Sequence, residues 1–324
     1  MANTLLNAVK DLRNDSLRDL VSASAFTGET PPPESSFPGS NYGYISGGTI
    51  SPDAIERFSF TSDGNATDVG DLFEGRYYCS GQSSSTHGYT SAGEPGAKNT
   101  IDKFPFTSGF TTATDVGNLT GGRNKVAGQS SIPNGYGYNT GGGNVIDKFS
   151  FSSDGDATVA GYTLTTRSNV TGQSSATHGY TSANSPITTD IDKFPFSSDD
   201  DATDVGDLTL ARSNTSGQSS ATHGYTSGGY TTGPGDAGRD DTIDKFSFST
   251  DANATDIGQL SASRNGSAGQ SSTTHGYTSG GYEPAPVGKT SHIDKFPFAS
   301  DFSGTATDVG DLVTGRYWAA GQQY

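Results

Sequence analysis

The chain has 324 residues, of which 30% are hydrophobic, 17% are charged and 45 are glycine. Its formal net charge is −16 at pH 7. This acidity argues against a nucleic-acid backbone or an anionic membrane surface as a partner, because both attract Lys and Arg. The single cysteine, Cys79, excludes an internal disulfide framework and a metal site built from several thiolates.

Residues 1–26 are predicted to form a short helical arm, either one bent helix or two short ones, and residues 27–40 a proline-rich extended linker. The apolar residues of the arm fall on two stripes: Leu5, Leu6, Val9 and Leu12, then Leu17, Leu20 and Val21. Charges interrupt any apolar core of a leader, and no run approaches the roughly 20 apolar residues of a membrane span. We therefore expect no secretory signal and no membrane insertion. The arm is predicted to dock on another protein or a second copy of the chain; the alternatives are packing against the repeats that follow and fraying.

Internal repeats organise the chain from residue 41 onward. The segment from Arg212 to Leu260 shows one whole unit, with four strand-length pieces separated by Gly, Pro, Asp and Thr-His-Gly turns. A signature of the first piece, Arg followed by Gly-Gln, begins at Arg76, Arg123, Arg167, Arg212, Arg264 and Arg316. A signature of the third piece begins at Ile55, Ile101, Ile146, Ile191, Ile243 and Ile293. Each unit is therefore predicted to be a four-stranded antiparallel meander.

The phase of the repeats predicts how the fold closes. The repeat region begins with a second strand, "NYGYISGG", and residues 316–324 form a first strand with no partners after it. We expect this C-terminal strand to become the inner strand of the first blade. The sequence thus predicts an all-β, six-bladed β-propeller over residues 41–324, with small-residue "SGQSS" strands innermost, where space is least.

The repeat resembles the Kelch repeat. The resemblance rests on the small-residue strand after Arg, the aromatic strand that ends in a glycine pair, and the hydrophobic and acidic start of the third strand. The glycine pairs are Gly47-Gly48, Gly141-Gly142, Gly228-Gly229 and Gly280-Gly281. The usual fourth-strand Trp is replaced by "ATDVGDL". The other two repeats depart from the glycine pair, with Ala92-Gly93 and Ala183-Asn184 at the equivalent positions. The repeat sequence "IDKFPF…ATDVGDL…R…AGQSS…HGYTSGG" is also similar to repeats of structural proteins of tailed phages, particularly marine ones.

Three repeated residue types are candidate sites with a structural alternative. The histidines His87, His178, His223 and His275 are expected to bond neighbouring Ser or Thr in turns, because equivalent positions in a propeller lie too far apart for one metal ion. The acidic turns after the third strands are expected to be ordinary turn formers; calcium is the alternative. The repeated arginines are predicted to pair with Asp of "IDKF" or "TDVGD" rather than to bind an anion.

Candidate binding residues lie where the repeats differ most, in the long connections between the second and third strands of the fifth and sixth blades. We expect these loops on one face of neighbouring blades. The candidates are Tyr230, Asp236, Arg239, Asp240, Tyr282, Glu283 and Lys289. The alternative is that loop length varies among the repeats without any functional role.

We predict no catalytic residue, no cofactor and no metal site. The function predicted is that of a non-enzymatic virion protein, assembled in the host cytoplasm, of the tail, neck, fibre or capsid surface. It would dock through residues 1–38 on other virion proteins or on copies of itself, and would contact a host-surface glycan or protein. The alternatives are an intracellular Kelch-type adaptor and, less favoured, a propeller enzyme of the oxidase or glycosidase type.

Overall fold

The computed structural model describes residues 39–107, 109–231, 235–299 and 302–323. The predicted helical arm, with Leu5, Leu6, Val9, Leu12, Leu17, Leu20 and Val21, lies outside the described residues, as does nearly all of the predicted linker. The repeat region is described from Gly39 onward.

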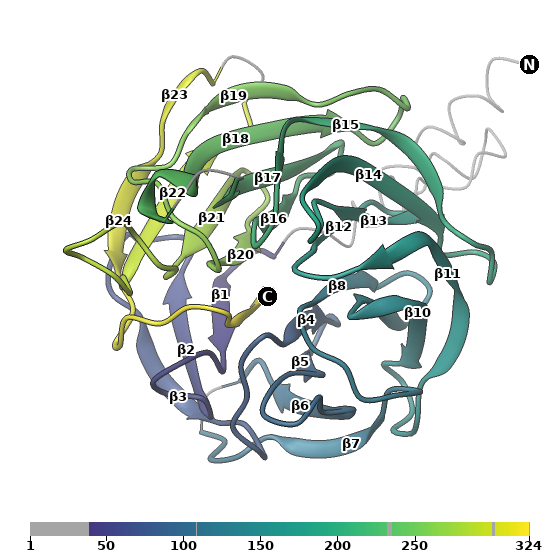
Figure 1. Ribbon diagram of the computed structural model, residues 1–324. Helices are drawn as coiled ribbons and strands as arrows, with labels where there is room; N and C mark the ends of the chain where they lie inside the picture. The colour runs from purple at the N-terminus through teal and green to yellow at the C-terminus, as the bar shows by residue number, and fades with distance from the viewer. Residues whose placement is uncertain (1–38, 108, 232–234, 300–301, 324) are drawn as a thin grey trace, which may run out of the picture. The chain divides into compact units, whose positions relative to one another are not determined.

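Six antiparallel sheets surround a central axis (Figure 1), which confirms the predicted six-bladed β-propeller. Within each blade the strands run in order from the axis outward. Blade 1 is β25 (Ala320–Gln323), β1 (Tyr42–Ser46), β2 (Ala54–Ser59) and β3 (Thr67–Asp71). Blade 2 is β4 (Ser80–Ser83), β5 (His87–Ser91), β6 (Thr100–Pro105) and β7 (Thr114–Asn118). Blade 3 is β8 (Val126–Ser131), β9 (Tyr136–Gly141), β10 (Gly143–Ser150) and β11 (Thr158–Arg167).

The second half of the ring repeats the pattern. Blade 4 is β12 (Thr171–Ser174), β13 (His178–Ser182), β14 (Thr188–Pro195) and β15 (Thr203–Arg212). Blade 5 is β16 (Ser216–Ser219), β17 (His223–Tyr230), β18 (Arg239–Ser247) and β19 (Thr255–Gln259), with the 3-10 helix η2 (Gly235–Gly238) between β17 and β18. Blade 6 is β20 (Ala268–Ser271), β21 (His275–Ser279), β22 (His292–Pro297) and β24 (Thr307–Asp311).

The C-terminal strand closes the ring as predicted. Strand β25 pairs antiparallel with β1, placing Gly321 opposite Ile45, and so completes blade 1 from both ends of the repeat region. Two details differ from the sequence-based boundaries. The inner strands begin three or four residues after the signature arginine, and Arg167 and Arg212 end the outer strands β11 and β15 instead. Blade 5 also gains a short fifth strand, β23 (Gly304–Thr305), parallel to β19.

Aromatic side chains join each blade to the next. The tyrosine of every second strand packs between two phenylalanines of the following blade; Tyr89, for example, lies 5.5 Å from Phe149 and 4.9 Å from Phe151 between ring centroids. Tyr277 of blade 6 does the same with Phe58 and Phe60 of blade 1. This explains why the "HGY" and "F-P/S-F" motifs recur together: each contact needs one motif from each of two blades.

The signature arginines tie the third strand of each blade to the segment that leads into its inner strand. Arg76 is fully buried and donates to Asp102 on the third strand of its own blade, with an N–O distance of 2.7 Å. The equivalent pairs are Arg123 with Asp147, Arg167 with Asp192, Arg212 with Asp244, Arg264 with Asp294, and Arg316 with Glu56. The predicted pairing with the Asp of "IDKF" is therefore confirmed, and these arginines do not reach the axis.

Two rings of residues surround the axis. Each inner-strand glutamine donates its side-chain N–H to a backbone carbonyl of the next blade, as Gln82 does to Tyr138 at 3.0 Å, and Gln322 closes this ring on Tyr89. Each inner-strand glycine lies so close to its neighbour that a Cβ would meet a carbonyl oxygen; at Gly128 that oxygen, from Gly81, would be 2.1 Å away. The glycine ring therefore narrows the axial channel and separates a well on one face from a well on the other.

Candidate functional site: the mouth of the axial channel

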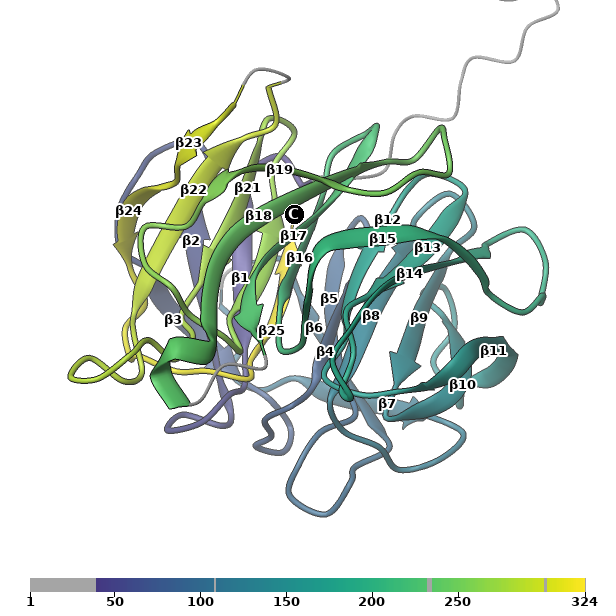
Figure 2. The same cartoon turned by 45° about the horizontal axis from the view of Figure 1, so that its top comes forward.

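The two faces of the propeller carry different connections (Figure 2). On one face, which we call the loop face, the connection between second and third strands contacts the segment that leads into the inner strand, as in the backbone bridges of Tyr77 with Glu94 and of Asn265 with Tyr282. The opposite face, which we call the turn face, carries the Thr-His-Gly turns and the acidic turns. The long loops of blades 5 and 6 lie on the loop face, as predicted.

Six residues, one from each blade, form the mouth of the axial channel on the loop face. They are Tyr78, Lys125, Asn169, Asn214, Gly266 and Trp318, and all have φ between 53° and 68°. Each backbone N–H donates to the carbonyl of the equivalent residue in the preceding blade, at 2.6–3.0 Å, so the six bonds close a ring. We call this set the mouth ring. Because each residue is held through both its N–H and its C=O, the ring is a rigid frame for its side chains.

The mouth ring is symmetric in its backbone and asymmetric in its side chains. In blades 4, 5 and 6 the positions are held by Asn169, Asn214 and Gly266, which are the residue types that adopt positive φ at least cost. Blades 1, 2 and 3 instead place Trp318, Tyr78 and Lys125 there. A bulky side chain in this conformation costs free energy, and such strain concentrates at ligand sites.

Two residues of the bulky half of the ring, Tyr78 and Trp318, belong to a longer line of contacting aromatic rings, which we call the aromatic arc. Tyr78 stacks on Trp318 with centroids 3.9 Å apart, and Trp318 contacts Tyr317 at 4.2 Å. Tyr317 meets Tyr282 of the blade 6 loop edge-on at 5.2 Å, and Tyr77 lies beside Tyr78. Cations cover the ends: Lys125 Nζ lies 5.3 Å from the centroid of Tyr78, and the Arg239 guanidinium lies 4.6 Å from that of Tyr282.

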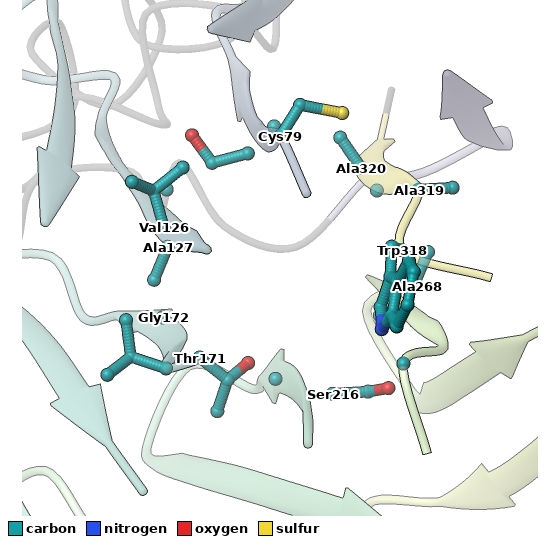
Figure 3. A pocket seen from close by; sticks show the side chains of 18 of the residues that line it. Cys79, Val126, Ala127, Thr171, Gly172, Ser216, Ala268, Trp318, Ala319 and Ala320 are labelled. Carbon is teal, nitrogen blue, oxygen red and sulfur yellow. The ribbon is translucent and has the colours of Figure 1, made fainter. Parts of the chain in front are cut away.

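Behind the mouth ring lies a well of about 640 Å³, including the part open to solvent. Its deeper wall is made of the inner strands, from Ser80, Ala127, Thr171, Ser216, Ala268 and Ala320 down to the glycine ring. Figure 3 shows Trp318 on one wall, across from Val126 and Ala127. Among the described residues, Trp318 Nε1 and Asn169 Oδ1 are buried and have no hydrogen-bond partner, although both residues line the well. Burial raises the pKa of Tyr78 far above its usual range, so its hydroxyl stays neutral.

Three exposed apolar side chains lie in the connections within blade 1 or leading into or out of it. Ile50, Phe73 and Val313 are 57%, 60% and 59% exposed, and all three lie in loop-face connections. Ile50 has a φ of 82°, a conformation that a β-branched residue rarely takes. The backbone N–H of Thr49 beside it donates to the carbonyl of Tyr317 at 3.0 Å, which ties this loop to the arc.

The seven loop candidates divide into two groups in the structure. Arg239 and Tyr282 extend the aromatic arc, Tyr230 bridges to Ser213 beside the mouth ring, and Lys289 is exposed. In contrast, Asp240 lies 2.9 Å from the buried Arg212. Glu283 is buried, 3.7 Å from Arg264 and 3.0 Å from His292 Nδ1. These two carboxylates belong to the arginine framework. The side chain of Asp236 lies outside the described part of the structure.

The other repeated residues have structural partners on the turn face. In all four Thr-His pairs the Thr Oγ1 lies 2.8 Å from the His Nδ1, as predicted. The acidic turns join blades: Asp154 pairs with Lys103 at 2.9 Å, and Lys148, Lys193 and Lys295 pair with the turns of the blades that follow them. Within the described ranges, no three His, Cys, Asp or Glu side chains gather where they could hold a metal ion.

Sequence reasoning missed the mouth ring. Its residues stand two places after each signature arginine, where Asn, Asn and Gly in three repeats contrast with Tyr, Lys and Trp in the others. Trp318 is also the single tryptophan of the chain. The contrast is visible in the sequence, but the closed ring of hydrogen bonds that makes this position special comes only from the three-dimensional arrangement.

Comparisons with known proteins support the fold alone. No family model and no curated protein matches the sequence. Among solved structures, one titled "Structure of YjhT" superposes with a TM-score of 0.62 at 11% identity, over 76% of this chain and 86% of that one. At this identity the likeness concerns the propeller and does not extend to a function. No helix in the described ranges is long and apolar enough to cross a membrane.

Proposed function

We propose that this protein is a non-enzymatic binding propeller of a phage particle, attached through residues 1–38 and contacting a partner through its loop face. A propeller is consistent with such an interaction role, because it is a rigid scaffold that presents loops. Tyr, Trp and Arg are the residue types most enriched among the energetically dominant contacts of interfaces. The aromatic arc, with Arg239 at one end, is the place on the loop face where they gather.

One observation carries the proposal: Gly39, the first described residue, and the aromatic arc lie on opposite faces. Gly39, the first described residue, donates its N–H to the carbonyl of Ser271 at 3.0 Å and bridges to Ser272. Ser271 ends β20 on the turn face, whereas Gly266 of the mouth ring precedes the other end of β20, at Ala268. The described chain therefore enters the propeller at Gly39 on the turn face, opposite the aromatic arc.

The assignment to a virion rests on the similarity of the repeat sequence to repeats in structural proteins of tailed phages. The repeated framework also suits this role, since the same pairs, stacks and rings join all six blades and leave few weak boundaries. The alternatives, an adaptor and an enzyme, lack a specific structural observation in their favour.

Electron microscopy of purified particles tests the proposal. We expect disc-shaped density for the propeller, with the turn face toward the particle and the loop face outward. A variant lacking residues 1–38 should fold but be missing from the particles, whereas Tyr162→Asn, an exposed change on the outer strand β11, should assemble normally. Absence of the wild-type chain from particles, or a loop face buried against the particle, would contradict the proposal.

A further inference from the structure

Strand β11, the fourth strand of blade 3, breaks a pattern that the fourth strands of the other five blades share. In those strands an aspartate carboxylate accepts a hydrogen bond from the N–H of the glycine two residues later, as Asp68 does from Gly70 at 3.1 Å. The equivalent aspartates are Asp115, Asp204, Asp256 and Asp308. Strand β11 instead has Val159 at this position and Tyr162 three residues later, where the other strands have Asp, Asn or Gln.

The apolar residues of β11 form a row on one side of the strand, which lies on the rim of the propeller (Figure 1). A bulge leaves Ala160 without an opposite residue on β10, so Val159 and Tyr162 point to the same side. Leu164, two residues after Tyr162, continues the row. The three residues Val159, Tyr162 and Leu164, which we call the β11 row, are 42%, 45% and 55% exposed. Exposed apolar residues that gather where the other repeats are polar indicate a contact surface.

We infer that the β11 row is a self-association surface, on which a second copy of this chain packs its own β11 row about a two-fold axis. Charge is the argument for this occupant. Each copy has a formal net charge of −16, so two copies repel one another wherever their acidic side chains meet. The fourth strand of every other blade contains at least one aspartate, whereas β11 contains no acidic residue. Among the fourth strands, β11 is therefore the one on which two copies can approach most closely.

The edge of β11 favours contact through side chains over pairing of backbones. The N–H of Tyr162 donates to Asp201 at 3.0 Å, and its carbonyl accepts the N–H of Ala202 at 2.8 Å, both from the acidic turn of blade 4. This part of the edge is covered and cannot add a strand. A two-fold axis places the same uncharged row on both sides of the contact. Because the row is short and Asp201 borders it, we expect weak association, with a dissociation constant on the order of 100 µM.

Other partners fit the β11 row less well. A basic protein or peptide would gain from the aspartates that β11 lacks, so any other blade would suit it better. An anionic membrane would be repelled by the net charge of −16. A different uncharged protein is the main competitor, and it predicts a chain that stays monomeric by itself. The inference of self-association does not depend on the assignment to a virion.

Restoring the repeat tests the inference while keeping the fold. Val159→Asp combined with Tyr162→Asp gives β11 the two aspartates that blades 1, 4 and 6 carry, and offers Gly161 the hydrogen bond of the other blades. This double variant should therefore melt no lower than the wild type. Leu210→Asp is the matched control, because it adds an acid at an exposed apolar position of β15, outside the row.

Sedimentation velocity of the full chain, from about 1 to 300 µM, brackets the expected dissociation constant. The wild type and Leu210→Asp should shift from monomer toward dimer as concentration rises. The double variant should need about tenfold more protein or higher for the same dimer fraction, because it places like charges opposite one another. If the double variant melts lower than the wild type, Tyr162→Asn takes its place, since blade 2 has Asn118 at this position.

Salt provides a second readout. Raising NaCl from about 50 to 500 mM should strengthen wild-type association, because the contact is apolar and salt screens the repulsion between the copies. A wild type that stays monomeric at high salt, a dimer that salt weakens, or a double variant that dimerises as well as the wild type would overturn the inference. Incorporation into particles through residues 1–38 is a separate event, so variants of the β11 row should still be found there.

Discussion

At the scale of single residues, most charged side chains of the propeller serve the framework. The signature arginines and the aspartates of "IDKF" are buried as pairs, and burial raises the pKa of Asp102, Asp147 and Asp192 despite the neighbouring guanidinium groups. Removing one partner of such a pair leaves a buried charge without compensation, which typically costs about 3–5 kcal/mol. These arginines and aspartates therefore serve folding and are not available to bind a partner.

The four turn histidines predict a loss of stability in mild acid. Burial, followed by the nearby lysines, lowers the pKa of His87, His178, His223 and His275 below the usual 6.5. Below the usual pKa, the unfolded chain therefore binds more protons than the folded chain. The stability that depends on neutral histidines is complete above pH about 6.5 and is lost as the pH falls toward the folded-state pKa values. Thermal melts between pH 7.5 and pH 5.5, values chosen to bracket that window, should show Tm falling with pH.

A variant with all four histidines replaced by asparagine isolates this effect. Asp102 and its equivalents have raised pKa values and act in the opposite direction, so the difference between the two proteins is the informative quantity. The wild type should lose stability relative to the variant as the pH falls through this window. Parallel curves would show that the histidines do not titrate differently on folding.

At the scale of elements, the inner strands depend on glycine for closure. A side chain at Gly128 would place its Cβ 2.1 Å from the carbonyl oxygen of Gly81, and backbone atoms at that distance must move. Gly128→Ala should therefore lower the free energy of unfolding by about 1–3 kcal/mol, the usual range for overpacking. Gly121→Ala is the matched control, since nothing lies within 4 Å of its added Cβ. Equal denaturation midpoints for the two variants would contradict this account.

The elements themselves could largely be predicted from the sequence, because each strand signature encodes its own contacts. In "IDKF" the Ile and Phe enter the core, the Asp meets an arginine and the Lys reaches the next blade. Such local, repeated requirements leave a visible period. The mouth ring leaves no such pattern, because what its six residues share is a backbone conformation and a closed circle of bonds. The fifth strand of blade 5 is equally hidden in the sequence, since Gly304 and Thr305 pair across a blade boundary.

At the scale of the whole molecule, the closure through β25 determines how the propeller responds to truncation. Removing residues 320–324 takes away Gly321 and Gln322 together, and so opens the glycine ring, the glutamine ring and the sheet of blade 1 at one place. The aromatic contact between blades 6 and 1 would remain, but the inner edge of β1 would be unpaired. We expect a strongly lowered Tm and a broader unfolding transition.

Removing residues 1–38 should have the opposite outcome, and the pair of truncations separates attachment from folding. The described contacts that begin at Gly39 close the ring without any earlier residue, so the shortened protein should keep its Tm and its Trp318 emission. Calorimetry on both truncations, with the full chain alongside, measures this directly. If the N-terminal truncation melted as early as the C-terminal one, residues 1–38 would be part of the stable core. The arm would then be unavailable as a tether, because a segment that the fold needs cannot be given up to a partner without unfolding the propeller it attaches.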